Sequence, residues 1–187
     1  MSALIIHGAI AAFYSYLSGS PFVYMNLFGF TTTQFGWIYG ANAVGLVMAS
    51  QINRILLRIR GSFQILLMVV SAQFCLTVAL LVCSFVGPGS RLGIVGLVFC
   101  FIFCQGFINP NGMALALQPF ARKAGIAVAF MGSMQMLAGA LASGLVSYLY
   151  DGTARPMIWV MLGSTAIGLT ILATRATSKG SETLSEG

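Results

Sequence analysis

Uncharged polar side chains lie inside the long apolar stretches of this sequence. They are the carboxamides Asn42, Gln73, Gln105, Asn109, Asn111 and Gln135. A carboxamide donates and accepts hydrogen bonds but does not titrate, so it can recognise a ligand or link two helices but cannot relay a proton. In apolar surroundings each of these groups needs a partner. Two roles therefore stay open for them: hydrogen bonds between helices, or the lining of a path for a polar ligand.

Groups that titrate or attack as nucleophiles are rare. The 187 residues include 3 acids and 1 histidine, and no acid falls well inside an apolar stretch. We interpret His7, near the start of the first stretch, as an interfacial or packing residue. Cys100 and Cys104 are one helical turn apart without a histidine or acid nearby in sequence, so we interpret them as buried apolar residues. We expect no enzyme, no metal site and no bound cofactor.

The composition is that of a protein built for lipid. Hydrophobic residues make up 58% of the chain and charged residues 6%, whereas soluble domains carry roughly 25% charged residues. The net charge of +6 does not indicate nucleic-acid binding, because the basic residues fall in the gaps between apolar stretches. No Lys or Arg precedes the first stretch, which we interpret as a spanning helix and not a cleaved signal peptide.

The elements that must position the carboxamides are six apolar stretches. Each is close to the roughly 20 residues that cross a bilayer as a helix. We therefore predict an all-α integral membrane protein with a six-helix transmembrane bundle over residues 1–174, followed by a disordered cytoplasmic tail over 175–187. The predicted helices are 3–27, 34–53, 62–86, 92–118, 126–150 and 156–174.

Basic residues predict the orientation of these helices. Those expected on one side are Arg54, Arg58, Arg60, Arg122 and Lys123, joined by Arg175 and Lys179 of the tail, while the other side holds Arg91 and Arg155. The positive-inside rule then places both termini in the cytoplasm of a multi-pass protein of the bacterial inner membrane. Aromatic residues near the predicted outer ends are expected to form an interfacial belt: Tyr24, Trp37, Tyr39, Tyr148, Tyr150 and Trp159.

Two prolines, Pro21 and Pro110, fall within predicted helices and are expected to kink them. Proline lacks a backbone N–H and frees a carbonyl, which in a membrane must find another donor. The sequence Asn109-Pro110-Asn111 is similar to the Asn-Pro-Ala motif of water channels. A second copy is absent from the sequence, so we set a channel aside.

Three segments of the sequence are informative together: "YLSGSPFVYMNLFGFTTTQFGWIYGANAVGLV" (16–47), "GFINPNGMALAL" (106–117) and "AGIAVAFMGSMQMLAGALAS" (124–143). In combination they resemble the C-terminal half of Bcr/CflA-type drug efflux transporters of the major facilitator superfamily. The resemblance implies one half of a major facilitator fold, made of two three-helix inverted repeats. It also implies an antiporter that uses the proton gradient to export small drugs or metabolites, and hence multidrug resistance. Examples are chloramphenicol-like and bicyclomycin-like compounds, sulfonamides and metabolites of the cysteine pathway.

The N-terminal half of that family carries an acid in its first helix and a Gly/Asp/Arg-rich cytoplasmic loop, and neither is in this sequence. We therefore expect the coupling acid to lie in a partner, a separate six-helix N-terminal half. A second copy of this chain is a less favoured partner. Residues expected to line the cavity for a small amphipathic substrate are Tyr14, Tyr16, Asn42, Gln105, Asn109 and Gln135. The alternative is a truncated transporter fragment without transport of its own, which a start at Met1 directly before the first helix would suit.

Overall fold

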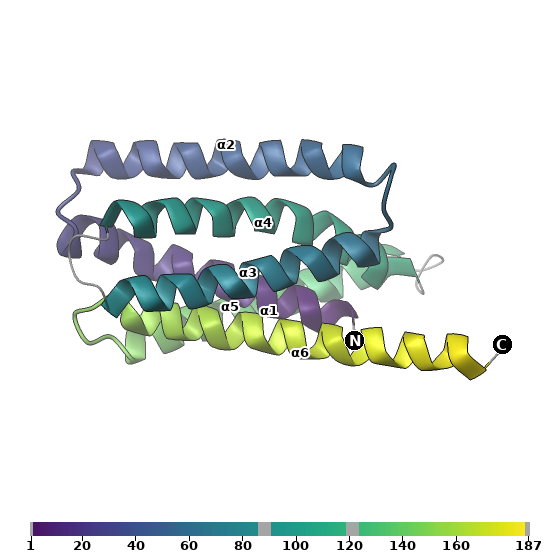
Figure 1. Ribbon diagram of the computed structural model, residues 1–187. Helices are drawn as coiled ribbons and strands as arrows, with labels where there is room; N and C mark the ends of the chain where they lie inside the picture. Colours follow the sequence, from purple (N-terminus) through teal and green to yellow (C-terminus); the bar gives the residue numbers. More distant parts are fainter. Residues whose placement is uncertain (1, 86–90, 119–123, 186–187) are drawn as a thin grey trace.

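The computed structural model describes residues 2–85, 91–118 and 124–185, all of them in helices or short connections (Figure 1). The side chains of residues 2–7 and 175–185, His7 included, lie outside the described part. The helices are α1 (Ser2–Pro21), the π-helix η1 (Phe22–Leu27), α2 (Thr32–Leu56), α3 (Ser62–Phe85), α4 (Arg91–Leu117), α5 (Ala124–Tyr148) and α6 (Arg155–Ser185).

The observed helices begin and end within about one turn of the predicted stretches, with one exception. Helix α6 continues to Ser185, whereas a disordered tail was predicted from residue 175 onward. The prediction ended the helix where the apolar residues end.

Four of the described helices are long and apolar enough to cross a membrane. They are Ser62–Phe85, Arg91–Leu117, Ala124–Tyr148 and Arg155–Thr174. Helix α2 is not among them, and its face toward α4 carries Asn42 and Asn53, both buried. The four helices support a membrane protein by length and composition.

Helix contacts divide the bundle into two interlocked groups of three. Helix α1 packs against α5 and α6, and α4 packs in the same way against α2 and α3. The remaining major contacts are α1 with α4 and α3 with α6. If each helix number is raised by three, with α1 counted again after α6, the same pairs of contacting helices result. Successive helices run in opposite directions (Figure 1), so α1 and α4 are antiparallel. The two groups thus share one contact pattern with opposite helix directions, which is consistent with the predicted repeats.

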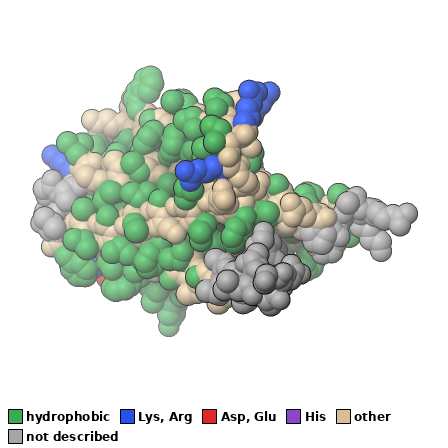
Figure 2. All heavy atoms as spheres, turned by 45° about the vertical axis from the view of Figure 1, so that its right-hand side comes forward, with side chains coloured by type: hydrophobic (Ala, Val, Ile, Leu, Met, Phe, Trp, Pro, Cys, Tyr) green, Lys and Arg blue, Asp and Glu red, His purple; other side chains and the backbone are tan. Residues whose placement is uncertain are grey.

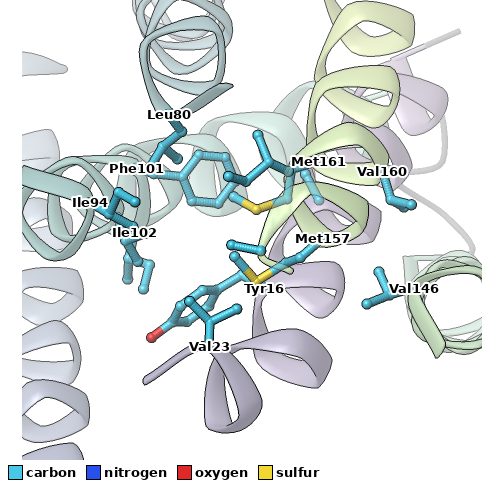
Figure 3. Packing of buried hydrophobic residues seen from close by; sticks show 14 of the residues in the cluster. Tyr16, Val23, Leu80, Ile94, Phe101, Ile102, Val146, Met157, Val160 and Met161 are labelled. Carbon is cyan, nitrogen blue, oxygen red and sulfur yellow. The ribbon is translucent and has the colours of Figure 1, made fainter. Parts of the chain in front are cut away.

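Buried side chains from α1, η1, α3, α4, α5 and α6 form the main apolar core. Tyr16 of α1 and Met157 of α6 lie close together, and the Phe101 ring of α4 lies next to Met161 (Figure 3). Much of the outer surface is also apolar: hydrophobic side chains cover the face shown in Figure 2. Helices α2 and α5 contribute many of these exposed side chains, such as Trp37 and Phe130.

Candidate functional site

Each internal proline frees a carbonyl that a serine hydroxyl approaches. Pro110 has no N–H for the carbonyl of Gly106, which instead lies 3.3 Å from Oγ of Ser50 on α2. The same hydroxyl is 3.0 Å from the Leu46 carbonyl, so its proton is shared. Helix α4 continues through Pro110 as one α-helix. A serine hydroxyl from a neighbouring helix thus replaces the hydrogen-bond donor that proline lacks.

Pro21 has a stronger effect on its helix. Helix α1 ends at Pro21 and the chain continues as the π-helix η1. The freed Leu17 carbonyl has a long contact of 3.5 Å with Ser20 Oγ. The change of helical pitch turns Tyr24 inward, where it is 1% exposed. The predicted interfacial position of Tyr24 is therefore wrong, whereas Trp37, Tyr148, Tyr150 and Trp159 are exposed.

Tyr16 and Asn42 form a buried link between α1 and α2. Asn42 Nδ2 donates to Tyr16 Oη at 3.0 Å, and the two side chains are 6% and 1% exposed, respectively. The Tyr16 ring stacks on Tyr39, whose hydroxyl shares a hydrogen bond with Ser20. The Tyr24 hydroxyl is buried next to this group and has no hydrogen-bond partner among the described residues. Both Tyr16 and Asn42 are thus committed to holding two helices together.

Gln105 likewise serves a helix contact. Gln73 Nε2 of α3 donates to Gln105 Oε1 of α4 at 3.0 Å, and each side chain is 1% exposed. One turn away, the hydroxyls of Thr77 and Thr165 meet at 3.1 Å and link α3 to α6. Of the two roles left open for these amides, the structure places Gln73 and Gln105 in the first, hydrogen bonding between helices.

Asn109 and Asn111 take opposite faces of α4. Asn111 is 1% exposed; its Nδ2 donates to Asn53 Oδ1 of α2 at 2.6 Å and to the Phe107 carbonyl at 2.8 Å. Asn109 is exposed. Two residues along a helix correspond to a rotation of about 200°, so both cannot face the same neighbour.

Tyr14 belongs to one small cluster, and Asn109 and Gln135 lie one helical turn from two of its members. This cluster, the α1–α4–α5 junction, is formed by Ile10, Tyr14, Met113, Ala116, Leu117 and Met131. Asn109 is one turn from Met113, and Gln135 is one turn from Met131. Tyr14 lies against Gly139 of α5 and its hydroxyl is 3.5 Å from the sulfur of Met136. All three keep part of their surface exposed. The junction has an aromatic ring and soft methionines, and two partly exposed amides lie one turn away, a combination that suits a polar or amphipathic ligand.

Among the described residues, surface pockets also lie elsewhere, and the candidate residues do not line the following three. One, of about 310 Å³, lies between α1, η1, α5 and α6, with Phe22, Tyr150 and Met157 in its lining. The others lie beside Arg60 and beside Asp151. At the α5–α6 connection, Asp151 accepts hydrogen bonds from the Thr153 hydroxyl and backbone N–H. Donation from Thr153 lowers the pKa of Asp151, so this carboxylate closes a turn at the end of the bundle.

The sequence pattern did not identify several polar residues that form contacts between helices in the structure. Asn53 was placed at the last position of a predicted span, beside Arg54, and was not considered as a helix link. Ser50 was not considered either, although its spacing of three residues from Asn53 puts both on one face of α2. That spacing, opposite the Pro110 region, is the signal that could have identified them.

The predicted cytoplasmic charges that the structure describes lie at one end. Arg54, Arg58 and Arg60 are exposed at the end of α2 and the following connection. Arg122 and Lys123 lie outside the described residues. Arg91 and Arg155 begin α4 and α6 at the opposite end of the bundle (Figure 1). Both ends of the described chain lie at the Arg58 end, in agreement with an even number of passages.

We expect Asn109 and Asn111 to respond differently to replacement by alanine. Asn111→Ala removes the partner of buried Asn53 and should lower the free energy of unfolding by about 1 kcal/mol. Asn109→Ala should change it by less than about 0.5 kcal/mol, as for other exposed positions. Denaturant titration in detergent micelles, followed by circular dichroism, measures both. Equal losses for the two variants would contradict the assignment of opposite faces.

Comparison with known proteins gives two curated relatives. The chain is 27% identical over 148 residues to the bicyclomycin resistance protein homolog of Haemophilus influenzae; the match covers 79% of this chain and 37% of that protein. It is 29% identical over 164 residues to the uncharacterized MFS-type transporter YdgK of Bacillus subtilis, covering 87% of this chain and 39% of that protein. No family model and no solved structure matches the chain significantly. The chain thus spans less than half the length of either relative, and over most of its own residues it is similar to drug-resistance and related transporters of the major facilitator superfamily.

Proposed function

We propose that the chain is the C-terminal half of a proton-coupled exporter of small drugs or metabolites. In this proposal all six helices span the bacterial inner membrane and both termini are cytoplasmic. The observation that carries it is the similarity to two transporters over 79% and 87% of the chain, while the chain spans only 37% and 39% of their lengths. A major facilitator transporter binds its substrate between two six-helix halves, so a second half is required.

The two interlocked repeats and the α1–α4–α5 junction support this role. Tyr14, Asn109 and Gln135 keep exposed surface there and are the residues that we propose to touch substrate. Tyr16, Asn42 and Gln105 are occupied in buried contacts and would hold the scaffold. The relative's bicyclomycin-resistance name favours bicyclomycin-like compounds among the possible substrates. No Asp or Glu occurs in the helical residues between Ser2 and Thr174, so we place the proton-coupling acid in the partner half.

The decisive experiment is export of a fluorescent or radiolabelled drug from cells without their own exporters. The chain alone should export nothing above background. Expressed together with an N-terminal six-helix half that carries a membrane acid, it should lower drug accumulation and respond to a protonophore. Asn109→Ala and Gln135→Ala should each weaken this export at unchanged membrane levels, whereas Asn26→Ala, at the exposed end of η1, serves as the matched control.

Each outcome decides between the candidates. Proton-driven export by the chain alone would overturn the claim that coupling lies in a partner. A chain that assembles with no N-terminal half and exports nothing would favour the second candidate, a transporter fragment without autonomous activity. Normal export by both amide variants would remove Asn109 and Gln135 from the substrate path.

A further inference from the structure

We propose that the groove between the α2–α3 connection and the first turns of α3 binds the headgroup and upper acyl chain of an anionic phospholipid. The groove has a volume of about 730 Å³ and is lined by Arg60, Gly61, Phe63, Gln64, Leu67 and Met68. The inference requires the chain to sit in a bilayer but does not depend on transport.

The arginine in this groove has only a weak partner. Nη1 of Arg60 lies 3.3 Å from the thioether sulfur of Met68. A thioether is a poor acceptor, whereas a guanidinium offers five N–H donors arranged to hold a phosphate with two hydrogen bonds. Arg58 and Arg54 are exposed nearby. Asp151, the one carboxylate among the described side chains, lies at the opposite end of the bundle. The described charge at this end is therefore positive.

Exposed apolar side chains beside the arginines identify the anion as lipid. Ile59 is 78% exposed between Arg58 and Arg60, and Ile55 is 62% exposed one turn earlier. Water solvates such side chains poorly, whereas the boundary between headgroups and acyl chains accommodates isoleucine and arginine together.

The lining of the groove is mixed at the end of the bundle and apolar further along α3. Arg60, Phe63 and Gln64 lie near the end of the bundle, and Leu67 and Met68 follow one turn along the helix. Phe63 and Leu67 are four residues apart and so lie on one face. A phosphate bound at Arg60 would have its glycerol and acyl carbons along these side chains. Free inorganic phosphate would gain nothing from that contact.

Native mass spectrometry of the purified chain tests the site. Detergent-solubilised protein is titrated with dioleoyl phosphatidylglycerol or dioleoyl phosphatidylcholine. The test variant is Arg58→Gln/Arg60→Gln, and the matched control is Arg91→Gln/Arg155→Gln, which removes the same charge at the other end. We expect the wild type to retain phosphatidylglycerol preferentially, the test variant to bind it roughly tenfold more weakly, and the control to differ by less than about twofold.

Several results would overturn the proposal. They are equal retention of the two lipids by the wild type, an equal loss in both double variants, or full displacement of the lipid by millimolar inorganic phosphate. The last result would assign a free-anion site instead. All four arginines are exposed, so gel filtration and circular dichroism should match the wild type. If the test variant does not purify, the wild type decides, because a lipid preference that survives 0.5 M salt would contradict an arginine–phosphate contact.

Discussion

Gly106→Ala should lower the stability of the bundle, although alanine is the better helix former. A Cβ atom at this position would lie 2.6 Å from the Leu46 carbonyl oxygen and 2.7 Å from Cβ of Ala49. One of these atoms belongs to the backbone of α2 and the other is a Cβ atom of α2, so neither can rotate away. Helix α2 would have to move outward, and we expect a loss of about 1–3 kcal/mol in the free energy of unfolding, as for other overpacked sites.

The same displacement would disturb two polar contacts. The Gly106 carbonyl, which Pro110 leaves without its helical donor, would lose the Ser50 hydroxyl. The Asn53–Asn111 pair, one turn further along both helices, would be stretched from 2.6 Å. Within an apolar environment each carbonyl or amide left without a partner adds to the cost.

Gly96→Ala on the same helix is the control. Its Cβ would meet nothing within 4 Å, so the substitution should be neutral or stabilising by up to about 1 kcal/mol through helix propensity alone. Unfolding in detergent with increasing sodium dodecyl sulfate, followed by circular dichroism, gives both values. If the two alanines shift the midpoint in the same direction, close contact at Gly106 does not limit stability.

The sequence predicts the helices well because their length and apolar composition are one-dimensional properties. Stretches near 20 apolar residues, separated by arginine, glycine or proline, place the helix ends within about a turn. The end of α6 was missed for the same reason: hydropathy reports where the apolar face ends and says nothing about a polar helix beyond it. A helix cap or proline would have been the relevant signal.

The candidate site depends on rotation about each helix axis, which apolar stretches do not encode. Asn109 and Asn111 look equivalent in the sequence, yet the packing of α2 against α4 buries Asn111 and leaves Asn109 exposed. Tyr24 was misassigned because the π-helix after Pro21 changes the angle between successive residues. The amides Asn42 and Gln105 were assigned to the right helices, but their partners Tyr16 and Gln73 follow from the contacts between helices.

The Gln73–Gln105 pair should show a positive coupling in a double-mutant cycle. Gln73 Nε2 donates to Gln105 Oε1 at 3.0 Å in a site where both are 1% exposed. Replacing either by leucine strands the other amide, at a cost of about 1–3 kcal/mol. Replacing both removes two buried amides, including the Gln105 Nε2 that has no partner, and should recover most of the loss.

Because the two single losses add to more than the loss of the double variant, the coupling energy should reach or exceed the largest value measured between membrane helices, about 1.7 kcal/mol. Thermal unfolding of the wild type, the two single variants and the double variant in one detergent measures it. Additive losses would show that the two amides act independently.

The double variant also tests whether this pair links helices or lines the substrate path in the assembled transporter. If this pair only links α3 to α4, export should persist when both amides are leucine, because the helices still pack at the same distance. Loss of export by a double variant that is as stable as the wild type would instead place Gln105 on the substrate path. Exposed Asn109 and half-buried Gln135 carry the opposite expectation, since their removal should impair export and leave stability unchanged. Measured together, the two sets of variants locate the path within the bundle.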